Sequence, residues 1–301
     1  MAVLAAAADA ATDDRAEFVG TESCISCHTE QVRAWQGSHH DLAMQHADSD
    51  SVLGDFSDAT FTYGKVTTTF LRRAGGYFVR TDGADGKLAE FQVRYTFGVS
   101  PLQQYLVEFP DGRVQALGVA WDTRPAADGG QRWFHLYPDA QVDHEDELHW
   151  TGPQQNWNYQ CAECHSTNLT KGYDPQTRTF NTQWSEVNVA CEACHGPGSN
   201  HVAWANKAED WEKMTDMGLE IALDARQSNS WQFDGDANSA RRILPIAHQN
   251  ETETCARCHS RRGIQSEDYI HGKAILDTHR VSRLSEGLYY PDGQIRDEVY
   301  V

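Results

Sequence analysis

The pattern of apolar and polar positions separates a central β-rich stretch from two flanking parts of different character. In residues 58–137, β-branched and aromatic residues gather in short runs, and turn-forming pairs such as Asp111-Gly112 separate several of them. Runs of this kind predict β-strands. We therefore expect an inserted antiparallel β subdomain at 58–137, in which 103–121 forms the clearest hairpin. The expected strands are 61–66, 67–73, 77–81, 88–97, 102–109 and 114–121.

The flanking parts lack this pattern and favour helices joined by loops. Residues 35–44, 202–224 and 237–243 are predicted to be helical, and 228–235 is predicted to be a loop. The expected fold class is therefore α+β, mainly helical and loop-like, with the antiparallel β subdomain inserted. No stretch of about 18 apolar residues is present, so no transmembrane segment is predicted.

The same pattern suggests how the chain is organised. Residues 1–19 begin with an alanine-rich run that resembles the tail of a signal peptide, and we expect them to be a residual signal or linker. Residues 20–57 and 138–301 contain all the cysteines and flank the subdomain at 58–137. Residues 288–301 resemble a hairpin cut short, which suggests that the native chain continues.

Composition and charge narrow the function. Of the 301 residues, 40% are hydrophobic and 10% are aromatic, which excludes a chain that is disordered throughout. Lys and Arg number 25 against 44 Asp and Glu, a formal net charge of −19. An acidic surface repels phosphate backbones, so no nucleic-acid partner is expected.

All eight cysteines fall into four copies of the pattern Cys-x-x-Cys-His, which is typical of covalent c-type haem attachment. One helical turn brings residues three and four apart onto one face. Both cysteines can then form thioethers while the histidine ligates the iron as proximal ligand. Four haem c groups are therefore predicted. The residues are Cys24, Cys27 and His28; Cys161, Cys164 and His165; Cys191, Cys194 and His195; and Cys255, Cys258 and His259.

Three other uses of these cysteines are weaker. Disulfides would explain an even number of cysteines but not the histidine after every pair. Structural zinc would use two Cys-x-x-Cys pairs, yet the nearest pairs are widely separated and zinc does not require the histidines. A thioredoxin-like dithiol would need one motif in an α/β context. Attachment of haem is completed outside the cytoplasm, so the protein is expected to be periplasmic or otherwise extracytoplasmic.

Ten histidines remain as candidate distal ligands, against four methionines. Ligation by two histidines is therefore the expected rule, and it generally gives a lower potential than His/Met ligation. His40 follows the first motif closely, and His201 follows the third across a glycine-rich turn, so these two are the stronger candidates. His144, His149, His248, His271 and His279 are further candidates, and His39, His46 and His135 are weaker ones.

Two parts of the sequence resemble a known family. The first motif followed by Trp35, Ser38, His40, Ala43 and Met44 is similar to the first haem unit of cytochromes related to the tetrahaem electron carrier of ammonia oxidisers. The run from Cys191 to Ser199, with His201, is similar to a run in that superfamily and in octahaem enzymes. The resemblance covers roughly residues 18–301. It extends to proteobacterial multihaem cytochromes in which such a region precedes tetratricopeptide repeats.

The resemblance implies several properties. His40 would be the distal ligand of a haem attached further along the chain, and His201 that of the haem at Cys255 and Cys258. The haem at Cys161 and Cys164 would be five-coordinate. A C-terminal repeat domain and further haems would follow in the native chain. All four motifs end in His, whereas ammonia-forming nitrite reductases have one that ends in Lys, which argues against that enzyme.

The favoured function is electron transfer through closely spaced haems, since about 300 residues leave each of four irons little surrounding protein. Whether the protein is also an enzyme stays open. The alternative is a multihaem oxidoreductase that acts on a small nitrogen or sulfur oxyanion at a five-coordinate haem, and no sequence feature selects its catalytic residues. A haem-bearing scaffold is a third hypothesis. Haem propionates would add to the acidic charge, so redox partners with basic docking surfaces are expected.

Overall fold

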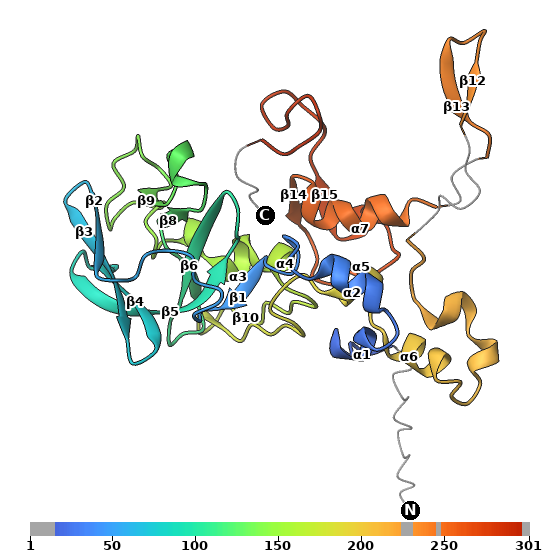
Figure 1. The fold of residues 1–301 in the computed structure, drawn as a ribbon, viewed down its shortest axis with the longest axis horizontal. Helices are drawn as coiled ribbons and strands as arrows, with labels where there is room; N and C mark the ends of the chain where they lie inside the picture. Colours follow the sequence, from blue (N-terminus) through green and yellow to red (C-terminus); the bar gives the residue numbers. More distant parts are fainter. Residues whose placement is uncertain (1–15, 224–230, 245–247, 297–301) are drawn as a thin grey trace, which may run out of the picture.

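The largest element of the fold is a nine-stranded antiparallel sheet at one end of the molecule (Figure 1). The computed structural model describes residues 16–223, 231–244 and 248–296. The strands follow the order β2-β3-β4-β5-β6-β8-β9, while β1 pairs with β5 and β7 with β6. They are β1 (Met44–His46), β2 (Ala59–Tyr63), β3 (Val66–Arg73), β4 (Gly76–Asp82), β5 (Leu88–Phe97), β6 (Leu102–Glu108), β7 (Val114–Ala116), β8 (Val119–Asp122) and β9 (Arg132–His135).

The sheet curls until its two outer strands meet, so it is nearly closed. The Tyr63 ring at the end of β2 stacks on the His135 ring at the end of β9, with ring centroids 3.6 Å apart. The Tyr63 hydroxyl also donates a hydrogen bond of 2.9 Å to the carbonyl oxygen of Tyr137. These side-chain contacts bring the ends of the two edge strands together.

Aromatic side chains fill the interior of the curled sheet. The Phe56 ring lies edge-on to four neighbouring rings, with centroids between 5.1 and 5.6 Å away. Those rings belong to Phe70, Tyr77, Tyr105 and Trp133. Edge-to-face packing at these distances is the preferred arrangement of aromatic rings.

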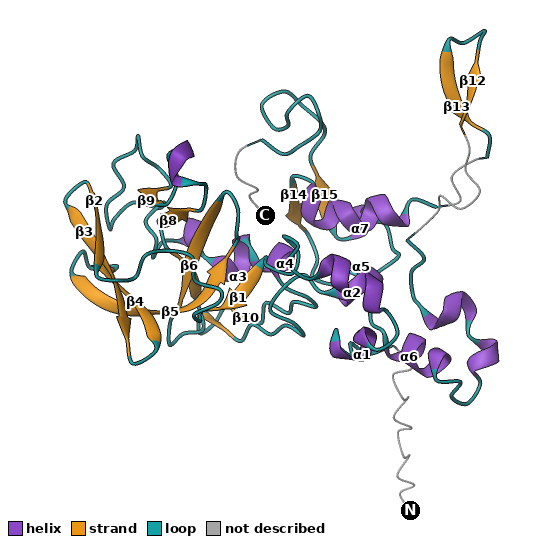
Figure 2. Cartoon of the chain, in the orientation of Figure 1, coloured by secondary structure: helices purple, strands orange, loops and turns teal. Residues whose placement is uncertain are grey.

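The rest of the described chain consists of short helices and small two-stranded sheets (Figure 2). The α-helices are α1 (Glu22–Ile25), α2 (Thr29–Trp35), α3 (Trp157–Gln160), α4 (Ala162–His165), α5 (Cys191–His195), α6 (Ser199–Ala205) and α7 (Asn250–His259). The 3₁₀ helices are η1 (Ala126–Asp128), η2 (Pro153–Gln155), η3 (Trp211–Lys213), η4 (Thr215–Gly218) and η5 (Ile275–Asp277). The small antiparallel pairs are β10 (Tyr173–Asp174) with β11 (Thr179–Phe180), β12 (Trp231–Asp234) with β13 (Ser239–Arg242), and β14 (Arg262–Ile264) with β15 (His279–Val281).

A second apolar cluster joins the sheet to α3 and α4. Met44, Leu106 and Trp157 are fully buried in it. Polar contacts reinforce the junction, because the Asn158 side-chain oxygen accepts a hydrogen bond of 2.7 Å from the Val114 N–H. The sheet therefore supports the helix that contains the second cysteine motif.

The expectation of a mainly helical fold is wrong. Strands make up 28% of the structure and helices 21%, and the large antiparallel sheet dominates. The physical reason is that each Cys-x-x-Cys-His unit needs only about one helical turn, so the cysteine-containing segments form very short helices. The β-rich stretch expected at 58–137 does form a sheet. Strand β1, which lies before this stretch in the sequence, also belongs to the sheet because it pairs with β5.

Several local predictions also fail. Residues 36–43 form turns after α2 instead of a helix, and 239–242 form β13 instead of a helix. Residues 231–234 are a strand where a loop was expected, while 228–230 lie outside the described residues. The described part of 202–224 holds only the end of α6 and the short helices η3 and η4. Residues 1–15 and the final 297–301 also lie outside the described residues, so the predictions made for them stay predictions. Within the described ranges, no helix is long and apolar enough to cross a membrane.

The aromatic interior generates a stability prediction. Phe56→Ala removes the ring that contacts four others, and we expect a loss of about 3–5 kcal/mol in the free energy of unfolding. Denaturant unfolding followed by far-UV circular dichroism measures this loss. Leu88→Ala on an exposed strand position is the control, and we expect its effect to be within about 0.5 kcal/mol. Equal losses in the two variants would contradict the assignment of this core.

Candidate haem-attachment sites

Each Cys-x-x-Cys-His unit lies on a short helical turn. The first spans the junction of α1 and α2, the second coincides with α4, the third is α5, and the fourth ends α7. In the first unit the His28 N–H donates a hydrogen bond of 3.0 Å to the Cys24 carbonyl oxygen, as in a helix. All eight cysteines are free thiols and lie within the described ranges. Thioethers require thiols presented in this way, so the turns fit haem attachment.

The four units lie next to one another, although long stretches of sequence separate them. Burial, followed by the nearby Cys191, raises the pKa of the Cys24 thiol to about 11. The Thr21 hydroxyl donates a hydrogen bond of 3.8 Å to the Cys191 sulfur. The first and third units are therefore neighbours.

Two further contacts extend the row of units. Burial, followed by the nearby Cys258 and Cys255, raises the pKa of the Cys194 thiol to about 11. The nearby Cys258 thiol, followed by burial, raises the pKa of Cys164, and Arg257 of the fourth unit contacts Glu163 of the second at 3.2 Å. Each unit thus has a neighbour, in the order first, third, fourth, second.

Two pairs of histidine rings face each other across these sites. The His28 and His201 ring centroids are 5.9 Å apart. The His40 and His259 centroids are 6.0 Å apart. Two imidazoles on opposite sides of one metal ion, each bonded at about 2 Å, have centroids about 6 Å apart. Both spacings therefore fit an iron held between the rings.

Two of the ring orientations are set by backbone carbonyl groups. His201 Nδ1 lies 2.8 Å from the Met217 carbonyl oxygen, and His165 Nδ1 lies 2.9 Å from that of Ala43. A proton on Nδ1 that is donated to a carbonyl leaves Nε2 free to bind a metal. Burial lowers the pKa of His165, which keeps that ring neutral and able to ligate.

The pairing of His201 differs from the expectation drawn from the resemblance. His201 faces His28 of the first unit, while His259 of the fourth unit faces His40. The His40 ring therefore lies opposite that of the fourth motif and the His201 ring opposite that of the first, while the ligand roles of both stay predictions. Sequence order alone does not reveal this arrangement, because the tertiary fold brings α6 back beside the first unit.

The remaining candidate histidines differ in their surroundings. His149 and His279 use both ring nitrogens within the protein: His149 contacts Thr151 and Asp82, and His279 contacts Thr278 and Glu163. The contact with Asp82 connects the loop that contains His149 to the end of strand β4.

Three other candidates lie elsewhere. His271 contacts the Ala193 carbonyl oxygen at 3.2 Å, and burial, followed by the nearby Arg257, lowers its pKa to about 4. His144 is exposed at the turn around Gly86. His248 precedes α7, and its buried Nδ1 has no hydrogen-bond partner. Of the weaker candidates, His46 and His135 lie on sheet strands and His39 is exposed.

Two carboxylates inside the motifs are buried and were missed by the sequence analysis. Glu192 of the third unit accepts hydrogen bonds of 2.7–3.1 Å from the N–H groups of Val19, Gly20 and Gly198. It therefore ties the segment before the first unit to the third. Its exposed fraction is only 2%.

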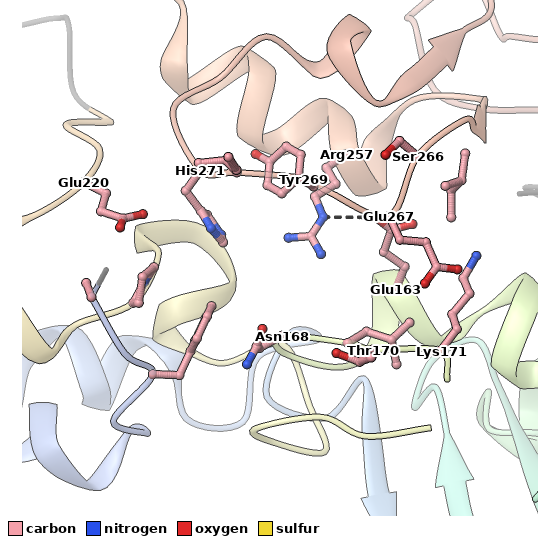
Figure 3. A pocket seen from close by; sticks show the side chains of 16 residues that line it. Glu163, Asn168, Thr170, Lys171, Glu220, Arg257, Ser266, Glu267, Tyr269 and His271 are labelled. Atoms are coloured by element: carbon pink, nitrogen blue, oxygen red, sulfur yellow. Dashed lines mark hydrogen bonds and ion pairs between the residues drawn. The ribbon is translucent and has the colours of Figure 1, made fainter. Parts of the chain in front are cut away.

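Glu163 plays the corresponding part between the second and fourth units (Figure 3). It contacts Arg257 at 3.2 Å and Arg262 and His279 at 3.1 Å each. Although burial raises it, the hydrogen bond from His279 and the charges of Arg262 and Arg257 hold the pKa of Glu163 at about 2. The sequence contains one signal for this ion pair. Glu163 and Arg257 have opposite charges and each directly precedes the second cysteine of its motif.

A cavity of about 290 Å³ lies beside Glu163 and Arg257. Lys171, Tyr269 and His271 line it together with Glu163 and Arg257 (Figure 3). None of the eight cysteines lines this cavity, so it is distinct from the attachment surfaces. Within the described ranges, no group of three or more His, Cys, Asp or Glu side chains is arranged to hold a bare metal ion.

The low pKa of Glu163 generates a prediction about acid stability. A carboxylate whose pKa falls on folding stabilises the protein above its ordinary pKa, and this stabilisation is lost as the pH falls from about 4.5 to 2. Glu163→Gln should therefore show a flatter decline in unfolding free energy across that interval than the wild-type protein. Glu108→Gln, at an exposed ion pair, is the control and should keep the wild-type slope. Identical slopes in all three proteins would contradict the role of Glu163.

Comparisons with known proteins agree with this geometry. The family model for cytochrome c554 and c-prime matches residues 23–60 and 131–196, which include the first three motifs. No curated protein matches the sequence. The solved structure of the outer cell wall cytochrome OcwA has the same fold, with a TM-score of 0.55 and 18% identity over 94% of this chain. An undecahaem cytochrome from the S-layer of Carboxydothermus ferrireducens gives a TM-score of 0.41 and 19% identity over 86% of this chain.

The chain spans 50% of OcwA and 29% of the undecahaem cytochrome. Residues 61–130, which separate the two ranges matched by the family model, contain strands β3 to β8. The fourth motif and His201 lie outside the matched ranges. The family-model match, the cysteine motifs and the shared fold together support a multihaem c-type cytochrome.

Proposed function

We propose that this chain is a tetrahaem c-type cytochrome that transfers electrons along one row of four sites. The observation that supports it is the order in which the units adjoin: the Thr21 hydroxyl before the first unit contacts Cys191 of the third, Cys194 of the third lies near Cys258 and Cys255 of the fourth, and Arg257 of the fourth contacts Glu163 of the second. Each bound haem would supply an iron that cycles between the ferric and ferrous states. The protein holds successive attachment points side by side, which keeps the transfer distances short.

The axial ligands follow from the ring geometry. We assign His28 with His201 to the first site and His40 with His259 to the fourth, because their ring spacings match that of an iron bound on both sides. His165 and His195 are the proximal ligands of the second and third sites. In this proposal the protein contributes fixed ligand positions and a covalent anchor at every site.

Haem content and spin state test the proposal. The purified protein should contain four haems per chain by the pyridine haemochromogen assay. His40→Ala and His201→Ala should each convert about one haem equivalent from low-spin to high-spin ferric iron in the electron paramagnetic resonance spectrum. His39→Ala is the matched control, since His39 is adjacent to His40 and exposed, and it should leave the spectrum unchanged.

Three outcomes would contradict this assignment. Fewer than four haems would reject the tetrahaem proposal. An unchanged spectrum in His40→Ala or His201→Ala would reject the corresponding axial pair. A spin change in His39→Ala would show that the neighbouring position supplies the ligand.

A second function is supported by the surroundings of His165. Its ring lies 4.5 Å from that of Phe97, and within the described residues no histidine ring pairs with it. A haem held there could keep one axial position open, which would allow oxidoreductase chemistry on a small nitrogen or sulfur oxyanion. The wild-type protein should then show a high-spin signal of about one haem equivalent that changes when nitrite or hydroxylamine is added. Exclusively low-spin signals would exclude this function.

Location and partners complete the proposal. Covalent haem attachment, together with the cell-wall location in the name of OcwA, supports an exported protein. We place it in the periplasm or another extracytoplasmic compartment. A formal charge of −19 favours redox partners with basic docking surfaces. The divisions 1–19, 20–57, 58–137 and 138–301, and a repeat domain after this region, stay predictions.

A further inference from the structure

A buried group of charges connects the second and fourth attachment sites. Glu163 lies in α4 and Arg257 in α7, at equivalent positions of two motifs. Arg262, just after α7, binds the same carboxylate at 3.1 Å, and so does His279. The Arg262 Nε–H also donates to the Arg257 carbonyl oxygen. We call these four residues the Glu163 cluster.

The Glu163 cluster has an excess of positive charge. One carboxylate faces two guanidinium groups, so the sum is at least +1 even when His279 is neutral. The side chains of Arg262 and His279 are 1% exposed, and those of Glu163 and Arg257 are 11% exposed. Water therefore screens these charges weakly. The protein as a whole is strongly acidic, which makes this positive excess a local exception.

The cluster lies against the sulfur atoms that would anchor two haems. Arg262 Nη2 is 3.6 Å from Cys164 Sγ. Arg257, which lies between Cys255 and Cys258 of the fourth site, contacts the same Glu163 carboxylate at 3.2 Å. The guanidinium charge is therefore next to the attachment points of both the second and the fourth sites. The Tyr269 ring covers Arg257 at 4.5 Å and limits access of water to it.

We propose that the Glu163 cluster sets the reduction potentials of the haems at the second and fourth sites, with Arg257 and Arg262 raising them and Glu163 lowering them. The inference rests on the proposed electron-transfer function and specifies which charges set the reduction potentials at the second and fourth sites. Reduction adds one electron to a haem and makes its charge more negative by one unit. A buried positive neighbour stabilises the reduced form, and a buried negative neighbour stabilises the oxidised form.

Charge-removing variants test the sign of the effect. Glu163→Gln should raise the potentials of two of the four haem transitions, and Arg262→Gln should lower them. A unit charge acting over about 12 Å at an effective dielectric constant near 20 changes an equilibrium constant about tenfold. We therefore expect shifts of about that size, or about 59 mV for a one-electron couple. Spectroelectrochemical titration of the purified holoprotein measures them.

Opposite signs separate electrostatics from structural damage, because loosened packing around a haem would not move the potentials in opposite directions for the two variants. Arg262→Lys keeps the charge and should stay close to wild type. Glu108→Gln and Arg94→Gln are matched controls, since these residues form an exposed ion pair on the sheet and should leave all four potentials unchanged. Haem content is measured first in every variant.

Two results would overturn the inference while leaving the electron-transfer function intact. One is a full complement of four haems with potentials that move in the same direction in Glu163→Gln and Arg262→Gln. The other is the absence of a shift in both variants. Failure of the proposed function would be seen differently, as fewer than four haems in the wild-type protein. If Glu163→Gln does not bind a full set of haems, Arg262→Gln and Arg262→Lys decide the inference: lowered potentials in the first with wild-type potentials in the second support it, and equal responses overturn it.

Discussion

Two buried carboxylates inside the cysteine motifs are the constraint on which the arrangement of the four sites depends. The motifs lie on helices of four to ten residues, and helices this short are marginally stable alone in water. Glu192 binds the backbone before the first motif and so ties it to the third. Glu163 binds Arg257 and Arg262 and so ties the second motif to the fourth. Hydrogen bonds to charged groups are stronger than neutral ones, and burial makes their loss costly.

The sheet supports one end of this row. Strand β5 ends at Phe97, whose ring packs against His165, and the Ala43 carbonyl group just before β1 accepts a hydrogen bond from the same histidine. Asn158 and the cluster around Trp157 connect the sheet to α4. The curled sheet therefore packs against the second site, while the first site lies at the other end of the row and has exposed motif residues.

Sequence reasoning predicted several strands because alternation and turn residues are local signals, but 114–121 contains parts of two strands, β7 and β8, and β9 was missed. The run 88–97 coincides with β5, and 102–109 differs from β6 by one residue. The helices predicted at 35–44 and 237–243 do not form, because tertiary contacts decide the conformation there. After α2 the chain turns so that His40 meets His259, and β13 forms because Ser239–Arg242 pair with β12. The partner of His201 could not be predicted, because ring pairing depends on how α6 folds back.

The sequence by itself predicted covalent haem attachment, because a Cys-x-x-Cys-His unit encodes its attachment geometry within a single turn. It also determined the β-rich character of residues 58–137 and the acidic charge. Only the tertiary structure decided the order of the sites, the histidine pairs and the burial of Glu163 and Glu192. Those features join residues more than a hundred positions apart, such as Cys24 with Cys191 and Glu163 with His279, and no local pattern specifies such contacts.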